Sequence, residues 1–144
     1  MSEHLPAMRE HLILVPVFNE AATIGDIVER ARLHGPVLVI DDGSTDDSAA
    51  RAVVAGAEVM TLAGRRGKGA ALRAGFAEGL RRGVSRVVTL DGDGQHDPDD
   101  IPRLLKVAVE EPRSLVIGGR LGGLAAYPER AMPTDRLAAL RVAG

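Results

Sequence analysis

The chain has 144 residues, a net charge of −2, 45% hydrophobic and 26% charged residues, and no cysteine. This length and composition indicate one soluble globular domain, and the lack of cysteine excludes disulfides and thiolate metal sites. Aromatic residues make up only 2% of the chain and the basic residues are dispersed, which argues against a nucleic-acid partner. Residues 1–10 form a tail without the apolar core of a signal peptide, and no apolar run approaches the roughly 18 residues of a membrane span, so we expect a cytoplasmic protein.

Short apolar runs alternate with helical patterns along the rest of the chain. The runs that we expect to form strands are 12–17, 36–40, 57–62, 85–90 and 114–119. Their continuous apolarity is typical of strands that are buried on both faces.

The segments between these runs have apolar residues at helical spacing. The residues that carry this spacing are Ile24, Ile27, Val28 and Ala31, then Leu72, Phe76 and Leu80, and finally Ile101, Leu104, Leu105 and Ala108. Thr45 or Asp46 could cap the second helix, and Asp97 followed by Pro98 is a typical start for the last one.

Alternating strands and helices predict an α/β fold, with an open, mainly parallel sheet, right-handed crossovers and helices on both faces. The pattern weakens after Leu121. We expect residues 121–135 to form a loop and residues 136–144 to begin a helix that stays incomplete.

The run 85–90 ends in an acidic stretch whose side chains could hold a cation. Asp91, Asp93 and Gln95 are spaced two apart, so on an extended strand they would face one way and could converge on Mg²⁺ or Mn²⁺. Gly92, between the aspartates, would let a ligand approach the backbone. The alternative is a solvated turn followed by a helix cap, and an isolated D-x-D pattern favours that alternative.

Polar residues also follow the second run and precede the second helix. Asp41 and Asp42 could accept hydrogen bonds from a nucleoside, whereas the residues after them could simply cap a helix. The basic segment 63–75 contains Lys68 between two glycines at a helix start, where phosphate binds well, although an ordinary solvated turn is the alternative. Because ligands bind at the carboxyl ends of parallel strands, the three segments together indicate a nucleoside diphosphate with a metal.

The motifs VPVFNEAATI, VIDDGSTDDS, GKGAALRAGF, LDGDGQHDPDDIPRLL and VIGGR occur in this order. Together they resemble the nucleotide-sugar-binding core of family 2 glycosyltransferases with the Rossmann-like GT-A fold, close to the dolichyl- or polyprenyl-phosphate mannose and glucose synthases. The resemblance covers residues 11–120.

The resemblance implies roles for the matching residues. The nucleoside pocket would be lined by Pro16, Phe18, Glu20, Ile40, Asp41 and Asp42. Asp91 and Asp93 would be the D-x-D pair, with Gln95 as a further metal ligand and Lys68 near the donor. Arg120 would reach the diphosphate or the sugar and, with Asp93, would be catalytic.

The implied reaction is metal-assisted transfer of a sugar from a GDP- or UDP-sugar to an acceptor, with polyprenyl phosphate as the expected one. Such an acceptor would place the protein at the inner face of the membrane. Residues 121–144 are short for the acceptor half of such an enzyme, and an uncovered sheet edge would favour weak homo-oligomers. The alternatives are a non-catalytic nucleotide-binding or assembly module and a nucleotidyltransferase of similar fold.

Overall fold

The computed structural model describes residues 11–110, 114–118, 124–128 and 137–141. The strands are β1 (His11–Val17), β2 (Val37–Asp41), β3 (Glu58–Thr61), β4 (Arg86–Thr89), β5 (Ser114–Gly118), β6 (Leu124–Pro128) and β7 (Leu137–Arg141). The helices are α2 (Ile24–Ala31), α3 (Ser48–Ala55), α4 (Lys68–Arg82) and α5 (Ile101–Glu110), with the 3₁₀ helices η1 (Arg32–His34) and η2 (Pro98–Asp100).

The strands form one sheet in the order β3-β2-β1-β4-β7-β5-β6. Strands β1 to β4 pair in parallel, whereas β7 pairs antiparallel with both β4 and β5, and β6 pairs antiparallel with β5. The predicted α/β fold with a mainly parallel sheet is therefore confirmed for the half of the sheet that is built from β1 to β4.

The expectation for the end of the chain was wrong. Residues expected in a loop form β6, and residues expected to begin a helix form β7, which lies between β4 and β5. A short run such as Leu-Ala-Ala-Leu has good helix propensity, but here it gains backbone hydrogen bonds from a strand on each side. Tertiary pairing overrides the local preference.

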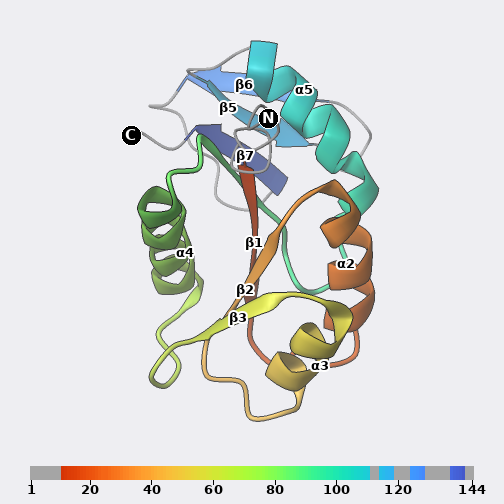
Figure 1. Ribbon diagram of the computed structural model, residues 1–144, viewed down its shortest axis with the longest axis vertical. Coiled ribbons are helices and arrows are strands. Elements are labelled where there is room, and N and C mark those ends of the chain that lie inside the picture. Colours follow the sequence, from red (N-terminus) through yellow and green to blue (C-terminus); the bar gives the residue numbers. More distant parts are fainter. Residues whose placement is uncertain (1–10, 111–113, 119–123, 129–136, 142–144) are drawn as a thin grey trace, which may run out of the picture.

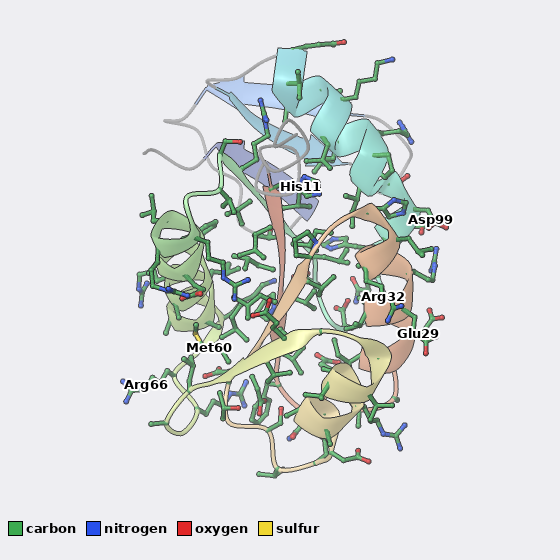
Figure 2. The ribbon with its side chains drawn as sticks, in the orientation of Figure 1. His11, Glu29, Arg32, Met60, Arg66 and Asp99 are labelled. Atoms are coloured by element: carbon green, nitrogen blue, oxygen red, sulfur yellow. The ribbon has the colours of Figure 1, made fainter. Side chains whose placement is uncertain are left out.

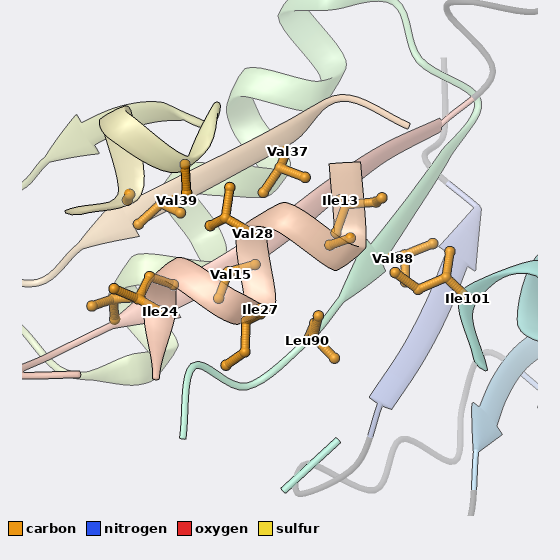
Figure 3. Packing of buried hydrophobic residues seen from close by; sticks show 14 of the residues in the cluster. Ile13, Val15, Ile24, Ile27, Val28, Val37, Val39, Val88, Leu90 and Ile101 are labelled. Atoms are coloured by element: carbon orange, nitrogen blue, oxygen red, sulfur yellow. The ribbon is translucent and has the colours of Figure 1, made fainter. Parts of the chain in front are cut away.

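Helices cover both faces of the sheet, as predicted. Helix α4 lies on one face, and α2, α3 and α5 lie on the other (Figure 1). Alternate residues of β1 supply the two cores: Ile13 and Val15 pack with α2 and α5, whereas Leu12 and Leu14 pack beneath α4. Figure 3 shows the first of these cores, in which Ile27 and Ile101 meet side chains of β1 and β4. Among the described residues, no helix is both long and apolar enough to cross a membrane.

Helix α4 buries small residues against the sheet, and of the predicted large ones Phe76 is partly buried against the core. Ala71, Gly75 and Gly79 are its buried residues, whereas Leu80 is 51% exposed. A Cβ on Gly75 would lie 2.6 Å from Leu14 Cδ1. Because these buried residues are alanine and glycine, α4 packs close to the sheet, and its first turn lies near the strand ends.

The start of α3 differs by a few residues from the prediction. The helix begins at Ser48, and the residue before it, Asp47, makes no side-chain capping bond. The carboxylate of Asp46 accepts a hydrogen bond from the Ser48 backbone N–H at 3.0 Å. Thr45 is not a cap, because its N–H and hydroxyl both donate to Asn19 Oδ1 in the preceding loop.

The predicted cap before α5 is confirmed. The Asp97 carboxylate accepts from the Asp99 N–H at 2.9 Å, and Pro98 occupies the first turn. A turn of 3₁₀ helix at Pro98–Asp100 precedes α5, so Pro102 falls in the first turn of the α-helix, where proline is tolerated.

Candidate functional site

A pocket of about 160 Å³ opens at the carboxyl ends of β1, β2 and β4, beside the start of α4. Its walls are formed by Pro16, Val17, Phe18, Glu20, Asp42, Arg65, Lys68, Ala71, Asp91, Gly92 and Asp93. The pocket therefore brings together residues from all three polar segments that the sequence singles out. Parallel strands make this possible because their carboxyl ends share one edge of the sheet.

The acidic segment after β4 is a turn and not the extended strand that the sequence suggested. Strand β4 ends at Thr89, and Gly94 has a φ of +83°. The Asp93 carboxylate accepts from the Gln95 N–H at 2.9 Å, which closes the turn. Asp91 and Asp93 still line the same pocket, whereas Gln95 is not among the lining residues. The turn, and not side-chain alternation, brings the two aspartates together.

Lys68 and Asp91 connect the basic and the acidic segments. The distance from Lys68 Nζ to Asp91 Oδ1 is 2.5 Å, and both side chains are partly exposed in the pocket. On its other side Asp91 meets the buried His96, whose Nδ1 accepts from the Asp91 N–H at 3.4 Å. This contact gives His96 a position behind the pocket, next to Asp91.

Asp42 fixes the backbone of the basic segment. Its buried carboxylate, 4% exposed, accepts from the N–H groups of Arg66 at 2.6 Å and of Gly67 at 2.9 Å. A Cβ on Gly43 would lie 2.8 Å from the backbone of Gly64, so glycine allows the two loops to touch. The Asp42 side chain thus positions the residues that lead into Lys68, in addition to lining the pocket. Figure 2 shows Arg66 at the outer end of this loop.

Ile40 and Asp41 lie behind the pocket wall. Ile40 is fully buried in the core beneath α4, and neither residue is among those that line the pocket. Asp41 is buried and accepts from the Ser44 N–H at 3.0 Å, which supports the loop after β2. The pairing of Val17 with Asp41 aligns the ends of the two strands. These positions hold the pocket in shape, and direct contact of either residue with a nucleoside stays a prediction.

Carboxylates crowd one side of the pocket. Burial raises the pKa of Glu20 above its ordinary value, and the neighbouring carboxylates of Asp93, Asp46 and Asp91 raise it further. A cation placed among these groups would relieve their mutual repulsion. Within the described part of the chain, no three His, Asp or Glu side chains are arranged to hold an ion. The oxygen donors of Asp91 and Asp93 suit Mg²⁺ or Mn²⁺ if a bound phosphate supplies further ligands.

Arg65 is a pocket residue that the sequence reading missed. Its guanidinium carbon lies 3.7 Å from the centre of the Phe18 ring, and both residues line the pocket. The sequence signal for a phosphate-binding arginine was the pair of arginines directly before Gly-Lys-Gly. The contact of Arg65 with Phe18, just after β1, depends on the fold. Arg120, the other arginine of interest, lies outside the described residues.

Comparisons with known sequences identify the family. The model described as Glycosyl transferase family 2 matches residues 12–137. Polyprenol monophosphomannose synthase of Mycolicibacterium smegmatis is 41% identical over 118 residues, which cover 76% of this chain and 44% of that protein. Undecaprenyl-phosphate mannosyltransferase of Micrococcus luteus is 37% identical over 117 residues, which cover 76% of this chain and 47% of that protein. The chain thus spans less than half the length of these relatives.

Solved structures agree on the fold. Glucosyl-3-phosphoglycerate synthase from Mycobacterium tuberculosis, solved with Mn²⁺, UDP and glucosyl-3-phosphoglycerate, matches with a TM-score of 0.64 and 28% identity. The match covers 78% of this chain and 44% of that one. The same enzyme solved with UDP-glucose matches 96% of this chain with a TM-score of 0.70, at 24% identity. The GT-A fold expected from the motifs is confirmed, and the chain belongs to glycosyl transferase family 2.

Proposed function

We propose that this chain binds a nucleotide-diphosphate sugar together with Mg²⁺ or Mn²⁺ and contributes the donor side of a sugar transfer to polyprenyl phosphate. The observation that carries the proposal is the pocket at the carboxyl ends of the strands, which Asp91, Asp93 and Lys68 line and in which Lys68 pairs with Asp91. A diphosphate needs both kinds of group, because its charge is neutralised by a metal on carboxylates and by basic side chains.

The pocket residues divide by chemistry. Asp91 and Asp93, with Gln95 as a proposed additional ligand, would hold the metal. When bound, the metal would supply Lewis-acid stabilisation of the departing diphosphate. Lys68 and Arg65 would contact the phosphates, and Pro16 and Phe18 offer the apolar surface on which a nucleoside can rest.

Glu20 would contribute to the nucleoside side of the pocket, with Asp42 holding the basic loop against it. The proposed donor is a GDP- or UDP-sugar, and a solved relative contains UDP. Arg120, outside the described residues, remains the proposed contact to the sugar or diphosphate.

The acceptor is proposed from the relatives. One relative described above is named a polyprenol monophosphomannose synthase, and the other an undecaprenyl-phosphate mannosyltransferase. A phosphate acceptor is already ionised at neutral pH and can attack the anomeric carbon without a general base. A lipid acceptor would place the reaction at the membrane surface, so we propose peripheral association with its cytoplasmic face.

A transfer assay tests this proposal. The protein is incubated with GDP-mannose or UDP-glucose, Mn²⁺ and a short-chain polyprenyl phosphate, and lipid-linked sugar is measured together with free nucleotide. Formation of lipid-linked sugar in an amount equal to the GDP or UDP released supports the proposal. Nucleotide binding without transfer would favour a nucleotide-binding or assembly module, and release of pyrophosphate from a nucleoside triphosphate would favour a nucleotidyltransferase.

A further inference from the structure

Thr23 stands immediately before α2, at the position where a threonine hydroxyl ordinarily caps a helix. Its side chain makes no capping bond to the helix. Instead, Thr23 Oγ1 donates to the carbonyl oxygen of Gly92 at 2.5 Å, across 69 positions of sequence. The hydroxyl therefore donates its hydrogen to the acidic turn, and its other contact is a longer one of 3.4 Å to the carbonyl oxygen of Glu20.

Gly92 lies between the two aspartates that line the pocket, and its carbonyl belongs to the peptide that joins it to Asp93. Glycine can rotate about its backbone bonds more freely than any other residue, so this peptide is the weak point of the turn. The space around Gly92 is tight, because a Cβ there would lie 3.1 Å from Val17 Cγ2 and 3.3 Å from the Pro16 carbonyl oxygen. The hydrogen bond from Thr23 restrains this peptide from outside the turn.

Resting on the proposed function, we infer that Thr23 is a positioning residue for the metal-binding aspartates. Its hydroxyl fixes the orientation of the Gly92–Asp93 peptide, and this orientation sets where the Asp93 carboxylate points relative to Asp91. Residues that orient metal ligands from behind typically affect metal affinity by about 10- to 100-fold. Thr23 is not among the residues that line the pocket, so it would act through the turn.

A second attachment joins the far end of the same segment to α2. Arg30 pairs with Asp97, and its Nη2 lies 2.8 Å from Asp99 Oδ2. Figure 2 shows Asp99 beside the end of α2, with Glu29 on that helix and Arg32 in η1 directly after it. This ion pair fixes the start of η2, several residues after the aspartates, so it provides a control for general loosening of the loop.

The test compares Thr23→Val, which keeps the shape and removes the hydroxyl, with Thr23→Ser, which keeps the hydroxyl. Binding of Mn²⁺ in the presence of saturating UDP is measured by the decrease of the electron paramagnetic resonance signal of free Mn²⁺. Binding of UDP without metal is measured by calorimetry. We expect about 10-fold weaker Mn²⁺ binding for Thr23→Val. UDP binding without metal should be unchanged, and Thr23→Ser should behave as the parent. Thr23→Ala replaces the valine variant if that variant does not fold.

The outcomes separate the inference from the function on which it rests. A parent protein that binds neither UDP nor Mn²⁺ would overturn both. A parent that binds both, with a Thr23→Val variant of equal Mn²⁺ affinity and merely lower thermal stability, would overturn the positioning role alone. Arg30→Met should leave Mn²⁺ affinity near that of the parent. If it weakened Mn²⁺ binding as much as Thr23→Val does, the effect would be general loosening and the assignment to Thr23 would be wrong.

Discussion

Lys68 Nζ lies 2.5 Å from Asp91 Oδ1, so the first residue of α4 is paired with the first residue of the acidic turn after β4. This ion pair places a protein cation where the proposed metal would sit. Binding of a metal and a diphosphate would then require Lys68 to leave Asp91 and turn to the phosphates. Removal of the Lys68 charge should therefore have opposite effects on the affinity for the metal and on the affinity for the diphosphate.

Lys68→Met should strengthen the binding of Mn²⁺ alone and weaken the binding of UDP. Asp91 loses a competing cation, which for a partly exposed ion pair corresponds to about two- to fivefold in affinity. UDP loses a charge-assisted hydrogen bond, which corresponds to about tenfold. Calorimetric titrations of each ligand measure both effects. Lys106→Met, on the exposed side of α5, makes the same charge change and should alter neither. Shifts of both affinities in one direction would contradict this account of Lys68.

Asp42→Asn should destabilise the protein. The carboxylate accepts from two backbone N–H groups, of Arg66 and Gly67, and an amide would present its own N–H groups to one of them. A buried donor left without an acceptor costs about 1–3 kcal/mol in the free energy of unfolding. Urea denaturation measures this loss. Asp47→Asn, on the exposed start of α3, should cost less than about 0.5 kcal/mol, and equal effects of the two variants would show that Asp42 does not hold the loop.

Gly75→Ala and Gly25→Ala should change stability in opposite directions. A Cβ at Gly75 would meet Leu14 Cδ1 at 2.6 Å and Ile40 Cδ1 at 3.0 Å, and such overpacking costs about 1–3 kcal/mol. A Cβ at Gly25 in α2 would meet nothing within 4 Å, so alanine there gains about 0.5–1 kcal/mol of helix preference. Thermal denaturation of both variants provides the measurement. A stabilising Gly75→Ala would mean that α4 does not lie as close to the sheet as described.

Glu78→Gln should lose stability in a pH-dependent manner. Hydrogen bonds from Arg81 and Arg82 lower the pKa of Glu78 from 4.5 to about 2. Because the pKa is lowered on folding, the stabilisation by ionised Glu78 is complete above pH 4.5 and is lost as the pH falls towards 2. The difference in stability between the parent and Glu78→Gln should therefore be constant near neutral pH and shrink below pH 4.5. A difference that stays the same at pH 3 would show that the ion pairs do not contribute.

The sequence predicted the parallel half of the sheet because β1, β2, β3 and β4 are short apolar runs separated by helical patterns with clear ends. It failed for β7, whose helix-favouring residues are held in a strand by β4 and β5. It also failed in part for α4: Phe76 packs against the core, but Leu80 is exposed, and close packing placed Gly75 and Gly79 on the buried face. Both failures arise from contacts between distant segments, which local patterns do not contain.

In the candidate site, too, local patterns indicated some residues, whereas contacts between distant segments determined the others. Asp91, Asp93 and Lys68 were identifiable because their segments end at one edge of a parallel sheet. Arg65 was missed, because its contact with Phe18 depends on how the loop after β3 folds back over β1. The roles of Asp42 and Thr23 as backbone anchors were also hidden, since each makes its bonds to a segment far away in the sequence.

The central claim is that the acidic segment contains two separate features, a metal site at Asp91 and Asp93 and a helix start at Asp97 to Asp100. Calorimetric titration of UDP and GDP with and without Mn²⁺, into the parent, Asp93→Ala and Asp99→Ala, tests this claim most directly. We predict that Mn²⁺ strengthens nucleotide binding to the parent and to Asp99→Ala, and that Asp93→Ala folds normally but loses the metal-dependent gain. Nucleotide and Mn²⁺ binding by Asp93→Ala equal to that of the parent would contradict the account.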